Sequence, residues 1–368
     1  MRVIVAVFLV GHGLIHLLGV ARAFGLAELP QLSSIPPSLG LLWLAAAVLF
    51  CAAGAALFVW PQGWWAIGTC AVIVSTIAIA MAWTDAKIGA LGNLIAIVMV
   101  FFGFMTQGPV SLRAAYNWDV GRGLARLAPA APITEADLAH LPEPVRRYLR
   151  IAGVVGQPRV SNFHVRMRGR IRSARDARWM PLQAEQYSFT DEPARFFYLT
   201  ASMFMIPVQG YHRYAGASAA MRIRAAAVVP VASASGEEMH RAETVTMFND
   251  MCLLAPATLV DPAIVWESVD GRTSRATFTS AGHSIRAELS FNEAGELVDF
   301  SSDDRYQASA DGKRFARVRW STPVSAYRSF GRVRLAAHGE ARWHEADGEY
   351  SYIEIDLDRV EYNVASRR

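Results

Sequence analysis

Residues 165–172 read VRMRGRIR, and this stretch decides the fold of the C-terminal part of the chain. Val165, Met167, Gly169 and Ile171 alternate there with four arginines. Successive side chains of a β-strand point to opposite faces of a sheet, so a period of two predicts an amphipathic strand with one polar face.

The same period of two recurs downstream. It is found at residues 221–224, 285–291, 315–320, 332–335 and 350–357, with turn sequences at Asp270-Gly271, Glu293-Ala294-Gly295, Asp311-Gly312 and Asp347-Gly348. Strands joined by short turns form an antiparallel meander. We therefore expect about nine to eleven strands in one strongly curved sheet, a half-barrel, because a sheet of that length must curl.

One helix interrupts the predicted strands. Apolar residues spaced three or four apart, among them Met239, Val245 and Phe248, predict a helix over about residues 237–254, and Pro256 ends it. We expect this helix to cover the concave face of the sheet. A half-open barrel under a helix leaves an apolar cavity, which is a natural place for an apolar ligand.

The N-terminal part has a different composition. The chain has 36 basic and 32 acidic residues, but residues 1–112 hold few of them. They are Arg2, Arg22, Lys87, Glu28 and Asp85. Four apolar runs occupy residues 3–20, 39–60, 64–83 and 88–105. Each is long enough to cross about 30 Å of hydrocarbon as a helix, so we expect a four-helix transmembrane region.

The first run also has features of a cleaved signal peptide. Polar and small residues from Gly11 to His16 interrupt it, and no clear cleavage site follows, so a retained helix is favoured. An even number of spans puts both ends of this region on one side. Four cations flank that side and two flank the other, which favours a cytoplasmic C-terminal domain. The four are Arg2, Arg113, Arg122 and Arg126, and the two are Arg22 and Lys87.

Several short motifs in the C-terminal part resemble those of a known family. They are Leu141-Pro142-Glu143-Pro144-Val145, Arg147-Tyr148-Leu149, Gly153, Trp179, Pro181, Asn249-Asp250-Met251, Ala255-Pro256, Trp266, Phe291-Asn292-Glu293-Ala294-Gly295-Glu296-Leu297, Asp304-Arg305-Tyr306, Trp320-Ser321-Thr322-Pro323, Gly339-Glu340, Trp343 and Glu361-Tyr362-Asn363. Over about residues 140–364 the chain resembles bacterial membrane-anchored proteins grouped under a domain of unknown function. The resemblance implies a bacterial cytoplasmic membrane protein and carries over no functional residue. The β-domain also resembles the half-barrel of lipoprotein carriers in fold.

The predicted architecture is therefore α + β with a membrane part. Residues 1–110 form the transmembrane four-helix region, 111–158 a linker with short helices, and 159–368 the antiparallel half-barrel. Thr134 with Asp137 suggests a capping box in the linker, and Gly153 a helix stop.

The predicted function is the binding of an apolar or lipid-like ligand in the β-domain. We expect the ligand to contact Phe196, Tyr198, Met203, Phe204, Phe248, Asp250, Trp266 and Trp320. The apolar runs that contain Phe196, Tyr198, Met203 and Phe204 are also explained by a strand that is simply buried in the core. The expected partners are the lipid bilayer and an apolar small molecule or lipid, and the oligomeric state is left open. Nucleic acid is not expected, because no nucleic-acid module is visible and the C-terminal part carries only a small positive charge.

The arginines of the opening stretch, Arg166, Arg168, Arg170 and Arg172, suggest a surface for anionic lipid headgroups. A solvated strand face explains them equally simply, since alternate positions of such a strand face water.

His12 and His16 share one face of the first apolar run. They are weak candidates for a metal or haem site or a proton relay, and the alternative is a pair of neutral histidines bonded to a neighbouring helix or a carbonyl. A membrane-substrate enzyme is a further alternative, with Asp250, Asp304 and either His240 or His283 as its polar groups. No nucleophile elbow, phosphate-binding loop or zinc-protease motif occurs, and no cofactor is expected.

Overall fold

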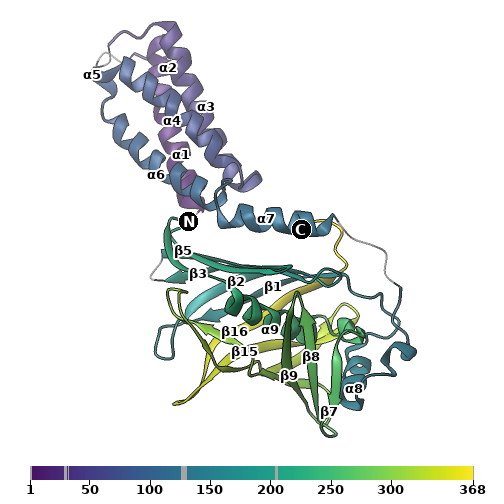
Figure 1. Cartoon of the computed structure of the whole chain (residues 1–368). Helices are drawn as coiled ribbons and strands as arrows, with labels where there is room; N and C mark the ends of the chain where they lie inside the picture. The colour runs from purple at the N-terminus through teal and green to yellow at the C-terminus, as the bar shows by residue number, and fades with distance from the viewer. Residues whose placement is uncertain (1, 29–30, 32, 126–130, 204–205, 368) are drawn as a thin grey trace. The chain divides into compact units, whose positions relative to one another are not determined.

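The computed structural model describes residues 2–28, 31, 33–125, 131–203 and 206–367. The chain divides into two compact units, Met1–Ala115 and Tyr116–Arg368. The first is helical and the second contains the β-sheet (Figure 1).

Four segments that begin in the helical unit are long and apolar enough to cross a membrane: Arg2–Ala23, Pro37–Val59, Trp64–Met81 and Gly89–Leu124, the last of which extends into the second unit. The prediction of four apolar helices is therefore confirmed. The helices of the unit are α1 (Arg2–Ile15), α2 (Leu17–Ala23), α3 (Pro37–Val59), α4 (Trp64–Met81), α5 (Trp83–Ala86) and α6 (Gly89–Gln107).

Small residues let α3 approach α1 closely. Ala53 and Gly54 are buried, and a Cβ atom added to Gly54 would lie 2.8 Å from Cγ2 of Val10. Ala52 and Ala55, which lie beside them in the sequence, are exposed. Helices α1, α3, α4 and α6 pack in that order, whereas α1 and α6 touch each other at few points.

Residues 111–158 were expected to be a linker with short helices, but no helix was assigned to the first part of that stretch. Helix α7 (Leu112–Leu124) lies there. Its buried side chains, Tyr116, Val120 and Leu124 among them, recur every four residues and form a stripe only one residue wide. That stripe is too narrow to stand out among the polar residues around it.

Two short helices follow, η1 (Glu135–Leu138) and α8 (Glu143–Ala152). The predicted capping box is present, with the Thr134 N–H donating to Asp137 Oδ2 at 2.8 Å. Gly153 ends α8 with φ of 75°, a left-handed conformation that favours glycine.

The second unit is built on one antiparallel sheet. Its strand order is β6-β5-β4-β3-β2-β1-β16-β15-β13-β10-β9-β8-β7, with β14 also paired to β15, and β11 and β12 form a separate pair. The sheet is not closed, and β6 and β7 are its edges. The strands are β1 (Asn162–Ile171), β2 (Met180–Phe189), β3 (Ala194–Met203), β4 (Ile206–Ala215), β5 (Ser218–Ala225), β6 (Val229–Ser235), β7 (Val265–Ser268), β8 (Thr273–Ser280), β9 (His283–Phe291), β10 (Leu297–Ser302), β11 (Tyr306–Ala308), β12 (Phe315–Arg317), β13 (Arg319–Ser321), β14 (Val324–Phe330), β15 (Val333–Glu345) and β16 (Gly348–Tyr362).

This sheet has fourteen strands, more than the nine to eleven expected. Much of β2 and β3 is buried on both faces, so these strands show no alternation of polar and apolar residues. The order also differs from a simple meander. The first strand, β1, pairs with the last, β16, and Val165 lies opposite Val360 in the middle of the sheet.

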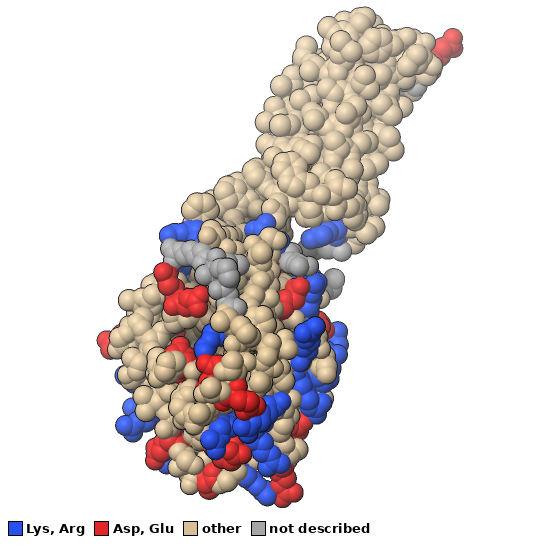
Figure 2. Space-filling model, turned by 90° about the vertical axis from the view of Figure 1, so that its right-hand side faces the viewer, with Lys and Arg blue, Asp and Glu red and all other residues tan. Residues whose placement is uncertain are grey.

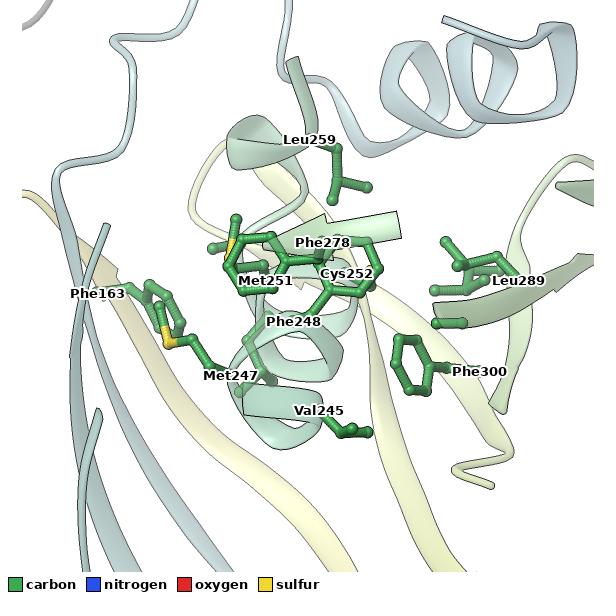
Figure 3. Packing of buried hydrophobic residues seen from close by; sticks show 14 of the residues in the cluster. Phe163, Val245, Met247, Phe248, Met251, Cys252, Leu259, Phe278, Leu289 and Phe300 are labelled. Carbon is green, nitrogen blue, oxygen red and sulfur yellow. The ribbon is translucent and has the colours of Figure 1, made fainter. Parts of the chain in front are cut away.

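Helix α9 (Glu237–Leu254) has the predicted bounds and lies within the curve of the sheet (Figure 1). It is buried on nearly every side. Phe248 stacks on Phe278 with ring centroids 5.0 Å apart and also contacts Phe300, which places α9 at the centre of the hydrophobic core (Figure 3).

Candidate functional site

A cavity of about 180 Å³ lies between α9 and the concave face of the sheet. Strands β1, β3, β15 and β16 and the second half of α9 supply most of its walls. The lining residues are Met167, Ile171, Gln186, Arg195, Phe197, Leu199, His212, Glu243, Thr246, Asn249, Asp250, Leu253, Leu254, Arg305, Trp320, Thr322, Val324, Ala336, His338, Gly339, Glu340, Ala341, Tyr352, Ile353, Ile355 and Leu357. We call this the sheet cavity.

One wall of the sheet cavity is largely apolar. Met167 and Ile171 come from β1, Ala341 from β15, and Ile355 and Leu357 from β16. The inward positions of β1 are those predicted from its alternation. This wall can accept a hydrocarbon group without leaving a polar atom unpaired.

The opposite wall is polar, and its central contact joins β3 to α9. Arg195 Nε donates to Asp250 Oδ2 at 2.6 Å. Gln186 Nε2 donates to the same oxygen at 2.8 Å. All three side chains are buried, and the carboxylate of Asp250 is held by donors from two strands.

Glu243, one turn before Thr246 on α9, extends this polar wall. Arg195 Nη1 donates to Glu243 Oε2 at 3.1 Å, and His212 Nδ1 lies 3.4 Å from Oε1. Burial alone would raise the pKa of the Glu243 carboxyl. The hydrogen bond from His212 and the positive charge of Arg195 outweigh burial and hold that pKa at about 2, so Glu243 is ionised at neutral pH.

Two further groups complete the polar wall. The Arg305 guanidinium lies over the ring of Trp320, 4.7 Å from its centroid. Thr322 Oγ1 donates to Asn249 Oδ1 at 2.6 Å. The charges of Arg195 and Arg305 balance those of Glu243 and Asp250, and Glu340, which also lines the cavity, is paired with Arg342. This wall therefore offers hydrogen-bond donors and acceptors without a net charge, which suits a neutral polar group better than an ion.

The predicted ligand contacts divide between the cavity and the core. Asp250 and Trp320 line the sheet cavity. Phe248 is fully buried in the core, and Trp266 packs beside it.

Two of the predicted contacts on β3, Phe196 and Tyr198, lie on the face of the strand opposite to the cavity. Tyr198 packs near Tyr116 of α7, and Phe196 packs against Phe189. Their neighbours Phe197 and Leu199 line the cavity instead. Met203 is exposed at the end of β3, and the predicted contact Phe204 lies outside the described residues.

Of the polar groups expected for an enzyme, Asp250 alone is found in the sheet cavity. Asp304 accepts from the backbone N–H of Arg286 at 2.8 Å and pairs with Arg317. His240 and His283 lie against each other, with ring centroids 4.4 Å apart, and do not line the cavity.

The arginine stripe of β1 faces outward and is paired with carboxylates. Arg168 lies 2.8 Å from Asp358, and Arg170 Nε donates to Glu354 at 2.7 Å, both on β16. Arg166 lies 4.0 Å from Glu185.

The last arginine of the stripe, Arg172, stacks on Trp179. Figure 2 shows basic and acidic side chains interspersed on the β-sheet unit. The lipid-surface role of Arg166, Arg168, Arg170 and Arg172 stays a prediction, and their local charge is largely balanced.

His12 and His16 bond to neighbouring helices and to the backbone. His12 Nε2 lies 2.9 Å from Asn93 Oδ1, and His16 Nε2 lies 2.7 Å from Ser75 Oγ. Within the described part of the chain, no group of three His, Cys, Asp or Glu side chains is arranged to hold a metal ion.

Sequence reasoning missed Arg195, Glu243 and His212. Each is a single charged or polar residue in an otherwise ordinary segment, and such residues usually face solvent. The available signal was the position of Glu243 between Ala242 and Val245, two residues of the apolar part of the predicted helix.

The sequence of residues 131–355 matches the family of unknown function DUF6544, which covers more than half of the chain. The protein belongs to this family. Several motifs quoted above for the resemblance, among them Asn249-Asp250, Arg305 and Gly339-Glu340, meet in the sheet cavity. No curated protein matches the sequence.

Two solved structures are partly similar. One is described as an outer membrane lipoprotein-sorting protein domain from Vibrio parahaemolyticus, with 7% identity, a TM-score of 0.34, and coverage of 56% of this chain and 87% of that one. The other is a DUF1329 family protein from Desulfovibrio piger, with 12% identity, a TM-score of 0.36, and coverage of 64% and 96%. Likenesses of this size say nothing about ligand or activity.

Proposed function

We propose that the β-sheet unit binds a lipid-like molecule in the sheet cavity. The apolar part of the ligand lies against β1, β15 and β16, and its neutral polar part lies at Arg195, Asp250 and Glu243. The observation that carries this proposal is one cavity with an apolar wall and a buried, hydrogen-bonded polar wall facing it.

The volume of the sheet cavity limits the size of the group that it can hold. A volume of about 180 Å³ is close to that of an engineered cavity of ~150 Å³ that holds benzene. The cavity therefore holds one ring or a short length of acyl chain, and the rest of a longer ligand lies outside it.

The four apolar segments hold the protein in the bacterial cytoplasmic membrane, with the β-sheet unit in the cytoplasm. The support is the distribution of cations. Arg2, Arg113 and Arg122 flank one side of the predicted spans, and Arg22 and Lys87 flank the other.

Native mass spectrometry with lipid extraction on the full chain tests the proposal. Ala341 is buried on β15 and lines the cavity, so Ala341→Phe fills it. Ala287 is equally buried on β9 but lies away from the cavity, so Ala287→Phe is the matched control. We expect a bound lipid-sized mass in the wild type and in Ala287→Phe that is lost in Ala341→Phe. The same lipids at the same occupancy in all three proteins would contradict it.

A further inference from the structure

One corner of the β-sheet unit exposes a group of apolar side chains. Met203 ends β3, Ile206 begins β4, Val229 and Val231 lie at the start of β6, and all four are exposed. Met203 lies opposite Ile206, and Val229 is connected to β4 through Ala225 of β5, which pairs with both strands. The four side chains therefore lie at one end of four neighbouring strands, and we call them the apolar rim. An exposed group of this kind marks a surface for a partner or a membrane.

The charged residues near the apolar rim are all basic. Residues 196–211 and 225–236 contain no Asp, Glu, Lys or Arg. The charged residues of β3 to β6, strands that the structure describes completely, are Arg195, Arg213, Arg222 and Arg224. The first two are paired with carboxylates inside the unit. The other two lie on β5 beside the rim, where Arg224 is opposite Pro230. Apolar side chains with arginines behind them suit a bilayer with anionic headgroups.

The edge strand at this corner is a poor template for a second β-strand. Pro230 lies between Val229 and Val231 on β6 and has no N–H to donate. Proline in an edge strand is one of the devices that prevent pairing with another chain. Hydrocarbon requires no hydrogen-bond donor, so a bilayer fits this surface better than an added strand does.

Helix α7 connects this corner of the sheet to the last apolar helix. Tyr116 of α7 lies beside Tyr198 in the middle of β3, with ring centroids 5.6 Å apart. Gly123 packs on the ring of Phe189, which lies opposite the first residue of β3. Helix α7 therefore runs backward along β3, and its N-terminal end is directed toward the apolar rim. Residues 108–111 separate α6 from α7 and can bridge at most about 18 Å. This tether keeps the rim end of the sheet close to a membrane that holds α6, whatever the angle between the two units.

We propose that the apolar rim inserts into the surface of the bilayer that holds the four apolar segments, with Arg222 and Arg224 at its anionic headgroups. The proposal rests on the membrane anchoring proposed above and does not depend on a ligand in the sheet cavity. Met203 of the rim and Leu199, which lines the sheet cavity, lie on the same face of β3. The docked rim therefore brings the end of that cavity wall to the lipid.

Photo-crosslinking on the full chain tests the proposal in vesicles of phosphatidylethanolamine and phosphatidylglycerol. Val229→p-benzoylphenylalanine places the crosslinker in the rim, and mass spectrometry measures the fraction of protein joined to phospholipid. Val265 on β7, the opposite edge strand, is the matched control, since it is 66% exposed and Val229 is 56% exposed. We expect about tenfold more lipid adduct from Val229 than from Val265. Equal yields at the two positions, or adducts from Val229 to a second copy of this chain, would overturn the proposal.

A third position separates the docking from the anchoring on which it rests. Ile73 of α4 is exposed, so a crosslinker there should form lipid adducts if α4 lies in a bilayer. Adducts at Ile73 without adducts at Val229 would refute the docking alone, and adducts at neither position would refute both proposals.

Charge and lipid composition give two further measurements of the Val229 adduct. Ile206→Asp places a charge in the rim and should lower the yield about tenfold, whereas Val265→Asp should leave it unchanged. A yield that persists in Ile206→Asp would contradict the docking. In vesicles of phosphatidylcholine alone the yield should also fall, because the arginines lose their anionic partners. An equal yield there would overturn the role assigned to Arg222 and Arg224.

Discussion

Arg195 on β3 and Asp250 on α9 are joined by a hydrogen bond of 2.6 Å between Nε and Oδ2, with both side chains buried. The pair connects the central helix to the sheet at the polar wall of the sheet cavity. Two buried charges are stable only with good geometry and further hydrogen bonds, which Gln186 and Glu243 supply here.

The first prediction concerns this pair. Arg195→Met leaves Asp250 and Glu243 buried without their shared cation, so we expect a loss of about 3–5 kcal/mol in the free energy of unfolding, measured by denaturant titration. Arg170→Met is the control, because its pair with Glu354 is half exposed and should contribute less than about 1 kcal/mol. Equal losses in the two variants would show that the buried pair contributes no more to the free energy of unfolding than the half-exposed pair does.

The second prediction concerns pH and Asp299 on β10. Burial raises the pKa of its carboxyl to about 6, against backbone hydrogen bonds from Phe300 and Thr322 that lower it. The folded state then binds this proton more tightly than the unfolded chain. Its stabilising contribution is complete below about pH 4 and is lost as the pH rises through 6.

Near pH 4, Asp299→Asn should therefore have the same melting temperature as the wild type. At pH 8 the variant should melt at a higher temperature than the wild type, which corresponds to a free energy of unfolding greater by about 1–3 kcal/mol. Asp303→Asn, at an exposed neighbouring carboxylate, is the control and should show no such divergence. A gap between Asp299→Asn and the wild type that is the same at both pH values would contradict this assignment.

The third prediction concerns the glycine in the stretch VRMRGRIR. A Cβ atom added to Gly169 would lie 1.9 Å from the backbone oxygen of Glu354 on β16. Gly169→Ala must therefore push two central strands apart, and we expect a loss of about 3 kcal/mol or more in unfolding free energy. At Gly339 on β15 the nearest atom is a side-chain methyl of Val324 at 3.2 Å, so Gly339→Ala should cost less than about 1 kcal/mol. The reverse ranking would mean that β1 and β16 are not paired as described.

The fourth prediction concerns the side of the membrane. A fluorescent protein fused after residue 368 should fluoresce, and alkaline phosphatase at the same point should be inactive, because the positive-inside rule puts the β-sheet unit in the cytoplasm. A phosphatase fusion at the loop between α3 and α4, near Gln62, should be inactive for the same reason. Strong phosphatase activity after residue 368 would place the unit on the other side.

The features of the fold that depend on neighbouring residues in the sequence could be predicted. Apolar residues at helical spacing mark the length of α9 and Pro256 marks its end, so its bounds could be predicted. The alternation in β1 is strong because one face of that strand is polar. The helix Leu112–Leu124 was missed because its buried stripe is narrow.

The long-range features could not be predicted in this way. The pairing of Val165 with Val360 leaves no local mark on either strand. On β3 the run from Phe196 to Leu199 is apolar at every position, so the sequence does not say which side chains face the cavity. Arg195 was missed because its burial depends on Asp250 and Glu243, which come from a distant helix.

The place of β16 has a consequence for protein synthesis. Strands β1 to β6 form one side of the sheet, β7 to β10 and β13 to β15 form the other, and β16 is the strand that joins them. It follows all the other strands of the sheet in the sequence, so each half has an open edge until residues 348–362 have been synthesised. A message cut short before codon 348 would yield two half-sheets with no strand between them. Such a product should be cleared by proteases or aggregate, so a premature stop anywhere before β16 should abolish the folded sheet.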